Sequence, residues 1–354
     1  MREFDYHTLA DRTWDNEILS YVAQIHEYRG KQELFLRQKP AELKRLIEIA
    51  KIQSTEASNR IEGIVTTNPR LRQLVQEKTT PRNRDEEEIL GYRNALAMVH
   101  ENYPYIPIRP NYILQMHGVM LKFTNFSYGG QFKTTSNEID MVMEDGTRVT
   151  LFRPLEPFET PAAVEAICES YQKCLAEEIV DPLILIPCFI LDFLCIHPFN
   201  DGNGRMSRLL TLLLLYRSGY MVGQYVSIEK AIADTKDSYY DALAAADRQW
   251  HEVQNDPKPF IRYMLGVILS CYREFESRTE LARSSGAKST SYDIVKAYAA
   301  ETIGTFTKQD ALISCPSLGS SSVEAALKKL VEDGTLTRLG SGRKTRYVRG
   351  DAFR

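Results

Sequence analysis

The sequence predicts a mainly α-helical protein that contains one β-hairpin and ends in a small domain of mixed helix and strand. Residues 183–196 and 209–216 are apolar nearly all round, which is typical of buried helices. Residues 139–152 hold two β-prone runs around a Glu-Asp-Gly turn, which indicates a hairpin. Residues 292–349 give helical patterns followed by two further β-prone runs.

The composition along the chain divides it into four segments. Residues 1–105 give amphipathic helical patterns with few turn signals and end at a proline-rich stretch. We expect a core at 106–275, a polar, serine-rich linker at 276–291 and the small C-terminal domain at 292–354. The 354 residues are 43% hydrophobic and carry a formal net charge of −3, which argues against a broad electrostatic partner surface.

The chain has the features of an intracellular protein. Its N-terminal residues are charged and lack the apolar core of a secretion signal. The longest apolar runs are broken by Pro187 and Asp192 or are too short to span a bilayer. The sequence therefore predicts a cytoplasmic protein without a membrane partner. The cysteines show no CxxC pair or metal-ligand spacing, so we expect reduced, mostly buried thiols at Cys168, Cys174, Cys188, Cys195, Cys271 and Cys315.

The most informative segment is the loop between the two apolar helices, which reads HPFNDGNGRMSRL at 197–209. Gly202 and Gly204 permit backbone angles that other residues disfavour. The start of the following helix directs unpaired N–H groups at one spot, which suits an anion. Arg205 and Arg208 lie about one helical turn apart, and their guanidinium groups match phosphate or carboxylate oxygens.

Two further residues of this loop have side chains suited to catalysis. Asp201 offers a hard oxygen ligand for a magnesium ion that bridges phosphates. His197 has the only side chain in the loop with an unperturbed pKa near neutrality, so it is the natural general base. Each residue alone also has a structural interpretation: a core histidine, a turn aspartate or an arginine pair on a solvated face.

Taken together, the loop resembles the signature of the Fic family, HxFx(D/E)GNGRxxR, at every specified position. Most Fic proteins transfer AMP from ATP to a Ser, Thr or Tyr hydroxyl of a target protein and release pyrophosphate. The phosphorylating relatives carry a lysine in place of the second glycine of GNGR, which this sequence retains. The matching residues are His197, Phe199, Asp201, Gly202, Asn203, Gly204, Arg205 and Arg208.

The resemblance implies a role for each residue of the loop. His197 would deprotonate the target hydroxyl, Asp201 would hold Mg2+ on the ATP phosphates, and Phe199 would anchor the loop in the core. Chemistry of this kind depends mostly on positioning and charge neutralisation, which suits a loop without a covalent nucleophile. The nucleotide would be bound by Gly202, Asn203, Gly204, Arg205, Met206, Ser207 and Arg208, with Arg205 and Arg208 neutralising the β- and γ-phosphates.

An upstream segment, STEASNRIEG at 54–63, resembles the autoinhibitory motif (S/T)xxxE(G/N) of this family, in the class with an N-terminal inhibitory helix. Ser58 and Glu62 lie one turn apart on the same helical face, and Gly63 is placed to end that helix. A serine and a glutamate at this spacing also occur on ordinary solvated helices. The resemblance implies that Glu62 pairs with Arg208 in the place of the γ-phosphate, so that ATP binds unproductively.

The β-hairpin resembles the flap that lies over the active site in this family. We expect strands at 139–143 and 147–152, with an edge that an extended target segment could join. The alternative is an ordinary surface hairpin. The family often has Gly-x-Phe/Tyr-Arg before the flap, where this sequence has Gly-Gln-Phe-Lys. Because Lys is not equivalent to Arg in a two-point contact, Gly130 and Lys133 are candidate residues for flap and target docking.

Residues 227–243 resemble the helix after the Fic core, whose paired tyrosines approach the nucleotide base. Tyr239 and Tyr240 fit that place. Adjacent residues on a helix do not share a face, so we expect one of them to pack in the core. We favour Tyr240 as the residue near the base.

Residues 292–354 resemble a winged-helix domain, with a helix-turn-helix followed by a two-stranded wing. The candidate recognition helix at 320–332 mixes lysines with acids and offers only small serines to a base edge. We therefore expect protein docking or homodimerisation ahead of DNA binding. A basic wing could still touch a phosphate backbone through Arg338, Arg343, Lys344, Arg346 and Arg349.

Three functional hypotheses follow. The first is an autoinhibited protein adenylyltransferase that modifies an unidentified target protein and itself. The second is an enzyme of the same fold with another donor, such as another nucleotide or phosphocholine, or with AMP-removing activity. The third is a nucleotide-sensing DNA-binding regulator. The intact His197 argues against the third hypothesis because a sensor needs no base.

Overall fold

The computed structural model describes residues 2–350 except 39, 143–147, 285–289, 303, 316–317 and 343–344. The chain divides into two compact units. The larger unit contains residues 1–30 and 50–271, and the smaller unit contains residues 31–49 and 272–354. Three helices contribute residues to both units: α1 (Asn16–Gln38), α2 (Pro40–Ile61) and α11 (Lys258–Ser284).

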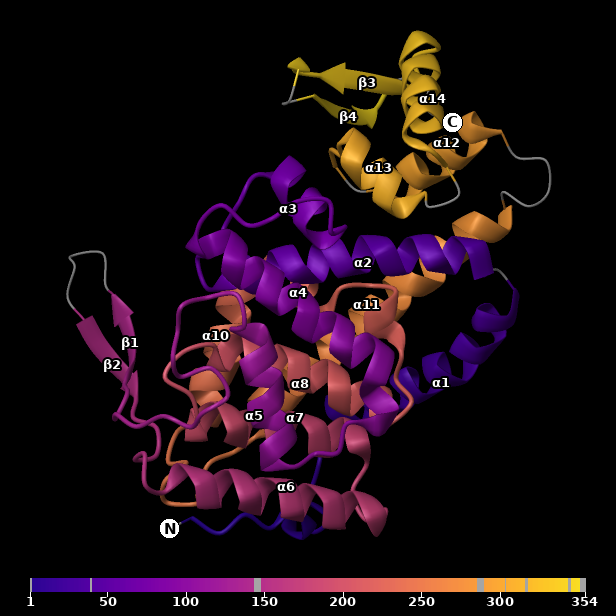
Figure 1. Ribbon diagram of the computed structural model, residues 1–354. Helices are drawn as coiled ribbons and strands as arrows, with labels where there is room; N and C mark the ends of the chain where they lie inside the picture. Colours follow the sequence, from indigo (N-terminus) through magenta and orange to yellow (C-terminus); the bar gives the residue numbers. More distant parts are fainter. Residues whose placement is uncertain are drawn as a thin grey trace. The chain divides into compact units, whose positions relative to one another are not determined.

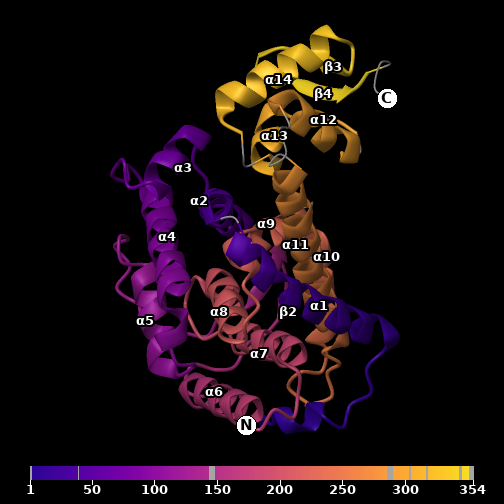
Figure 2. The same ribbon diagram turned by 90° about the vertical axis from the view of Figure 1, so that its right-hand side faces the viewer.

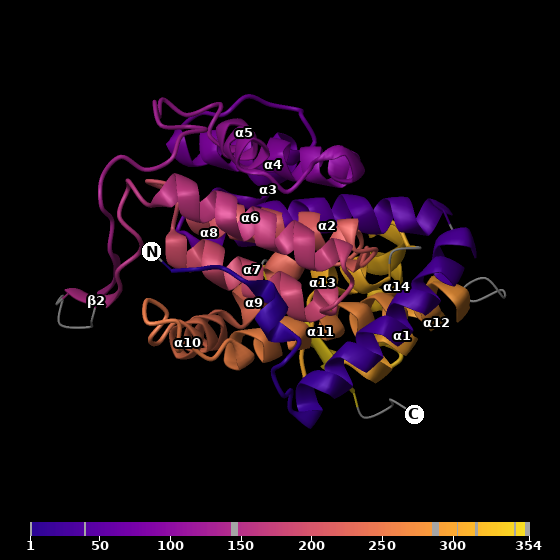
Figure 3. The ribbon, with the colours of Figure 1, turned by 90° about the horizontal axis from the view of Figure 1, so that it is seen from below.

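The larger unit is built around two buried helices, α7 (Pro182–Ile196) and α8 (Asn203–Arg217), which pack against each other. All residues of α7 after Pro182 are buried, as the apolar pattern predicted. The helix α6 (Thr160–Ala176) packs on α7, and α4 (Arg84–Asn102) packs on α8. The views in Figures 2 and 3 show these neighbours and place α5 (Pro110–Met120) alongside α4.

The apolar helix α7 carries one buried acid, Asp192. Its carboxylate accepts hydrogen bonds from Tyr6 Oη at 2.9 Å and from Trp250 Nε1 at 2.7 Å. Burial raises the pKa of Asp192, although Arg2 and these two donors oppose that effect. Asp192, which interrupts the apolar run at 183–196, is therefore a core residue with a hydrogen bond to each carboxylate oxygen. No helix in the described part of the chain is long and apolar enough to cross a bilayer.

A glycine brings α4 and α5 into direct backbone contact. A Cβ atom on Gly91 would lie 1.8 Å from the carbonyl oxygen of Met120, at the end of α5, so a larger side chain would force the helices apart. This close approach holds α5 beside α4, and α5 carries the fully buried His117. Other short elements of this unit are η1 (Tyr6–Leu9), α3 (Asn68–Val75), η2 (Tyr103–Tyr105), η3 (Val222–Gln224), α9 (Ile228–Asp234) and α10 (Lys236–Ala246).

The predicted β-hairpin is present as β1 (Ile139–Val142) and β2 (Arg148–Phe152), which pair antiparallel. Ile139 lies opposite Phe152, and the register shifts between Ile139 and Asp140. The expected Glu-Asp-Gly turn falls outside the described residues. The hairpin projects from the helices of the larger unit (Figures 1 and 3).

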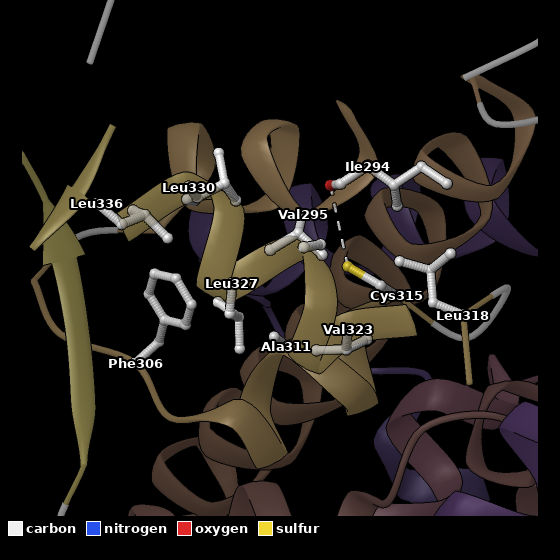
Figure 4. Close-up of a cluster of buried hydrophobic side chains, with 12 residues drawn as sticks. Ile294, Val295, Phe306, Ala311, Cys315, Leu318, Val323, Leu327, Leu330 and Leu336 are labelled. Carbon is white, nitrogen blue, oxygen red and sulfur yellow. Dashed lines mark hydrogen bonds between the residues drawn. The ribbon is translucent and has the colours of Figure 1, made fainter. Parts of the chain in front are cut away.

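The smaller unit contains the helices and hairpin expected near the C-terminus. Thr290 and Thr307 each form a capping box, with Asp293 and Asp310 respectively, which fixes where α12 and α13 begin. A continuous apolar cluster joins all three helices to the hairpin (Figure 4), and Phe306 pairs with Tyr347 as an additional bridge. The elements are α12 (Ser291–Glu301), α13 (Lys308–Ser314), α14 (Ser320–Glu332), β3 (Leu336–Leu339) and β4 (Arg346–Arg349).

Three residues of the expected basic wing form hydrogen bonds within the protein: Arg338 donates to Thr345 Oγ1 at 3.4 Å, Arg346 donates to Thr305 Oγ1 at 3.3 Å, and Arg349 bonds the end of α12. The Arg349 guanidinium donates to the carbonyl oxygens of Ala299 at 2.9 Å and Thr302 at 3.1 Å, at the end of α12. This contact satisfies helix C-terminal carbonyls with a cation. Two other expected wing residues, Arg343 and Lys344, lie outside the described residues. The winged-helix assignment stays a prediction.

The expected linker at 276–291 differs from the structure, because α11 continues to Ser284. Residues 276–284 include Glu, Leu, Ala and Arg, which are good helix formers. Their polar composition is therefore that of a hydrophilic helix and not of a linker. Residues 285–289, within the same expected linker, lie outside the described residues. All six cysteines are buried and free, as expected.

Candidate active site

The loop between α7 and α8 has two left-handed residues and internal hydrogen bonds from its own Asn203. His197, directly after α7, adopts a left-handed backbone with φ of 51°, and Gly202 does so before α8 with φ of 82°. The Asn203 side chain spans the loop: its Oδ1 accepts from the Phe199 N–H at 2.9 Å, and its Nδ2 donates to the Phe199 carbonyl at 2.8 Å. Phe199 is fully buried, as the sequence predicted.

The hydrogen bond of one ring nitrogen fixes the tautomer of His197. Its Nδ1 lies 3.3 Å from the Leu194 carbonyl, which can only accept, so Nδ1 carries the proton and Nε2 has a lone pair. Burial lowers the pKa of His197 to about 4, and the ammonium of Lys133 acts in the same direction. The imidazole is therefore neutral near pH 7, which is the form that a general base requires.

Asp201 has a partly exposed carboxylate. Its Oδ1 accepts from the Gly202 N–H at 2.6 Å, its Oδ2 lies 3.8 Å from Arg205, and the side chain is 43% exposed. No cluster of three His, Cys, Asp or Glu side chains that could hold a metal occurs among the described residues. A single carboxylate suits Mg2+, which usually keeps several waters and binds to substrate phosphates as well.

The two arginines of the loop have different surroundings. Arg205 is buried and forms an ion pair with Glu88 of α4, with Nη1 and Oε2 2.8 Å apart. Glu88 also accepts from Arg84 at 2.9 Å. Sequence reasoning did not single out Glu88. The available signal was an acid on a helix that buries mostly apolar residues.

Arg208 is the centre of the second predicted constellation. Its Nε donates to Ser58 Oγ at 2.8 Å, and its Nη2 donates to the Ser58 carbonyl at 3.0 Å and to Glu62 Oε1 at 2.7 Å. Burial raises the pKa of Glu62, but the charge and hydrogen bond of Arg208, together with the charges of Arg205 and Lys236, outweigh burial, so the pKa lies below its usual value. The structure thus joins residues 146 positions apart into one ion pair.

The Glu62 carboxylate lies against the first turn of α8. A Cβ atom on Gly204 would be only 2.4 Å from Glu62 Oε1, so the absence of a side chain there makes room for the carboxylate. Gly63 has φ of 79° and follows the end of α2 at Ile61, as its position predicted. Lys236 of α10 donates to the Ile61 carbonyl at 2.9 Å and so caps the same helix end. An acid therefore occupies the anion-attracting start of α8.

Besides Arg205, which is buried against Glu88, three of the predicted nucleotide-binding residues turn their side chains into the protein. Asn203 braces the loop, Met206 is fully buried, and the Ser207 hydroxyl donates to the Gly204 carbonyl at 2.8 Å. These residues can meet a nucleotide only through their backbone. The reason is local: every residue of the first turn of α8 except Gly204 is buried, so the side chains there contact protein.

The paired tyrosines divide as expected. Tyr239 is 4% exposed and packs edge-to-face against Phe260 and Tyr263. Tyr240 is 42% exposed, and Lys236 Nζ lies 5.7 Å from its ring centroid. The residue favoured for the nucleotide base is thus the accessible one.

Gly130 and Lys133 have internal contacts in place of the expected docking surface. The Gly130 N–H donates to His117 Nδ1 at 3.0 Å. Lys133 is 2% exposed, and its Nζ donates to the Ile196 carbonyl at 3.1 Å. The expectation that Lys133 contacts a target is corrected by this burial: the ammonium supports the loop from inside the protein. Sequence reasoning also missed His117, because a single histidine in an apolar helix does not by itself indicate a functional site.

The chain is similar in sequence to known proteins of the Fic family. Residues 107–215 match the family described as Fic/DOC family. Over 236 residues the chain is 28% identical to a protein adenylyltransferase Fic from Culex quinquefasciatus, covering 63% of this chain and 41% of that protein. It is 29% identical over 128 residues to a Fido domain-containing protein from Dictyostelium discoideum, covering 35% of this chain and 85% of that protein. The chain thus spans less than half the length of the Culex relative.

A solved structure has a similar fold. A Fic family protein from Desulfovibrio desulfuricans superimposes with a TM-score of 0.62 at 22% sequence identity. The match covers 96% of this chain and 98% of that chain. This likeness shows the fold, a mainly helical core with a small antiparallel hairpin.

Proposed function

Because residues 107–215 form a domain of the Fic/DOC family, we propose that this protein is an adenylyltransferase that moves AMP from ATP to a hydroxyl of a target protein. The observation that carries the proposal is the loop from His197 to Arg208. It combines a neutral imidazole with a free Nε2, an accessible carboxylate and the N-terminus of α8. The names of relatives such as the Culex protein support the same activity.

The geometry supports an in-line displacement at the α-phosphorus. A Ser, Thr or Tyr hydroxyl of the target loses its proton to Nε2 of His197 as its oxygen bonds to phosphorus. The bond from phosphorus to the bridging oxygen breaks, and pyrophosphate leaves with that electron pair. Asp201 would hold a magnesium ion, which supplies charge neutralisation at the phosphates. The backbone of Gly202 to Gly204 and the side chain of Arg208 would bind the phosphate oxygens.

We further propose that the enzyme is autoinhibited by Glu62. In the structure this acid is the anion bonded to Arg208, so a γ-phosphate and the carboxylate compete for the same guanidinium. Like charges in one site repel each other, and ATP would have to bind with its phosphates displaced. The protein is then active only when Glu62 leaves Arg208, and self-modification is an expected readout of that activity.

The donor is tested by intact-protein mass spectrometry. We expect Glu62→Gly protein incubated with ATP and magnesium to gain the mass of one or more AMP groups. A matched series with GTP, CTP, UTP and CDP-choline reports the donor preference. Addition of a nucleotide other than AMP would change the proposed donor. No added mass with any donor, either alone or on proteins of a cell lysate, would contradict the proposed transfer.

The low pKa of His197 predicts an unusual pH profile. The neutral imidazole is the reactive base, and protonation sets in only as the pH falls towards about 4. We therefore expect kcat/KM of Glu62→Gly protein to stay level from about pH 8 to about pH 6 and to decline below about pH 5. Initial rates in buffers of constant ionic strength measure this profile, with circular dichroism confirming that the protein stays folded. A midpoint near 6.5 would contradict the buried, neutral base.

The structure favours this proposal over a DNA-binding regulator. Arg349 caps α12, Lys308 of α13 pairs with Glu324 of the candidate recognition helix α14, and Lys328 of that helix lies 3.8 Å from Glu332. Such pairs reduce the positive field that a phosphate backbone requires. A role in protein contact is the better proposal for the smaller unit.

A further inference from the structure

Two buried polar side chains outside the loop, His117 and Lys133, hold it at opposite ends. Both are within 2% of full burial, and neither belongs to the signature HPFNDGNGRMSR. Buried polar groups carry a desolvation cost unless their hydrogen bonds are made. The hydrogen-bond partners of His117 and Lys133 therefore indicate what these side chains do in the fold.

His117 bridges the entry to the flap and the peptide between Asp201 and Gly202. Its Nδ1 accepts from the Gly130 N–H at 3.0 Å, and its Nε2 lies 3.0 Å from the Asp201 carbonyl. An N–H can only donate and a carbonyl can only accept, so the two partners select the neutral tautomer with the proton on Nε2. The ring also stacks on Phe199, with centroids 3.8 Å apart and planes inclined by 12°.

The same peptide group controls the Asp201 carboxylate. Its carbonyl is held by His117, and its N–H, from Gly202, donates to Asp201 Oδ1 at 2.6 Å. A rotation of this peptide would carry the carboxylate with it. Gly130 can reach His117 because it has φ of 78° and lies close to α5, where an added Cβ would be 3.2 Å from the Leu114 carbonyl.

Lys133 brackets His197 from both sides. Its Nζ donates to the carbonyl of Ile196, just before the histidine, and its main-chain N–H donates to the carbonyl of Pro198, just after it, at 2.8 Å. Lys133 Nζ is itself oriented by Asn137 Oδ1 at 3.0 Å. His197 has a left-handed backbone, which costs free energy in a residue with a side chain, so bonds on both flanking carbonyls would be needed to keep it there.

We propose that His117 and Lys133 are separate positioning residues for the transfer reaction, His117 for the metal-binding carboxylate of Asp201 and Lys133 for the base His197. This inference rests on the proposed function. Because His117 acts on Asp201 and Lys133 acts on His197, loss of His117 should change magnesium-dependent ATP affinity. Loss of Lys133 should change kcat. Partners that orient a metal ligand typically change metal affinity or activity by about 10- to 100-fold when they are lost.

The test uses Glu62→Gly protein as the parent. His117→Phe keeps a ring on Phe199 but removes both hydrogen bonds, and His117→Gln retains an amide donor. Calorimetry measures ATP affinity with and without magnesium. We expect His117→Phe to reduce the gain in ATP affinity from magnesium by about tenfold, with a smaller loss in His117→Gln and little change without magnesium.

For the other support, Lys133→Met removes the donor at similar length, and Lys133→Arg restores a cationic donor. Because a small misplacement of a catalytic group can cost about 100-fold in rate, we expect Lys133→Met to lower kcat by up to about 100-fold at saturating ATP and magnesium, with unchanged ATP affinity and substantial recovery in Lys133→Arg. Lys133→Gln is the substitute if Lys133→Met does not fold. Lys122→Met, at an exposed lysine just after α5, is the matched control and should behave as the parent.

The outcomes separate this inference from the proposed function. If the parent transfers no AMP, the proposed function fails, while the calorimetric arm still tests the role of His117. If the magnesium-dependent gain is unchanged in both His117 variants, the assignment of His117 is wrong. If Lys133→Met matches the parent in kcat, or if Lys133→Arg is as slow as Lys133→Met, the assignment of Lys133 is wrong.

Discussion

Glu62→Gly protein is expected to transfer AMP about 10- to 100-fold faster than the wild-type chain. The substitution removes the carboxylate that is 2.7 Å from Arg208 Nη2 and leaves the guanidinium available to a γ-phosphate. A hydrogen bond to a charged group contributes about 1.5–3 kcal/mol, and about 1.4 kcal/mol corresponds to a tenfold change. Because the Glu62 side chain is 33% exposed, solvent screening places the effect towards the lower end.

The rate is measured from the accumulation of AMP-modified protein at saturating ATP. Glu62→Gln keeps the size of the side chain without its charge and should give an intermediate rate. Glu56→Gly is the matched control, since Glu56 is a partly exposed residue of the same helix whose partner is Arg60. A glycine there loosens α2 by about 1 kcal/mol without touching the loop. Equal activation by Glu56→Gly would assign the effect to loss of helix stability and refute inhibition by the Glu62 carboxylate.

His197→Ala protein is expected to lose transfer activity by about 10²- to 10⁴-fold, the range that general base catalysis contributes. The substitution removes the only ring in the loop that offers a free nitrogen. His197 forms no ion pair with the arginines in the described structure, so ATP affinity should change little. Loss of transfer with retained binding separates catalysis from nucleotide sensing.

This measurement is made in the Glu62→Gly background, where the starting rate is higher. His251→Ala serves as the control because its ring bonds the Arg153 carbonyl outside the loop. Thermal denaturation of each variant checks that the fold is retained. A double variant that still transfers AMP at a rate near that of Glu62→Gly would show that another group takes the proton, and the assignment of His197 as base would fail.

Much of the site was predictable because its chemistry is contiguous in the chain. The residues from His197 to Arg208 lie between two helices whose apolar character is evident in the sequence, and Gly202 marks the left-handed turn. The motif from Ser58 to Gly63 required a resemblance to connect it to Arg208, since nothing in a single sequence reports a contact over 146 positions. The hairpin was predictable from its turn residues and β-prone strands.

Other features were not predictable because they depend on burial. Lys133 resembled a docking residue at the surface, and only the packing of the flap entry on α5 turned its ammonium towards the Ile196 carbonyl. Asn203 and Ser207 matched a nucleotide-binding pattern, but their side chains bond the loop and the helix turn. The segment from 276 to 284 had a polar composition that suits both a linker and a helix, and its good helix formers continue α11 to Ser284.

The sequence by itself determined the catalytic loop, because residues adjacent in the chain share one backbone turn whatever surrounds them. Local glycine angles and flanking apolar helices are sufficient to place the base and the acid near each other. Only the tertiary structure decided which distant groups complete the site: Glu62 at Arg208, Glu88 at Arg205 and His117 at the Asp201 carbonyl. These partners come from other helices, and their distances depend on how α2, α4 and α5 pack around α8.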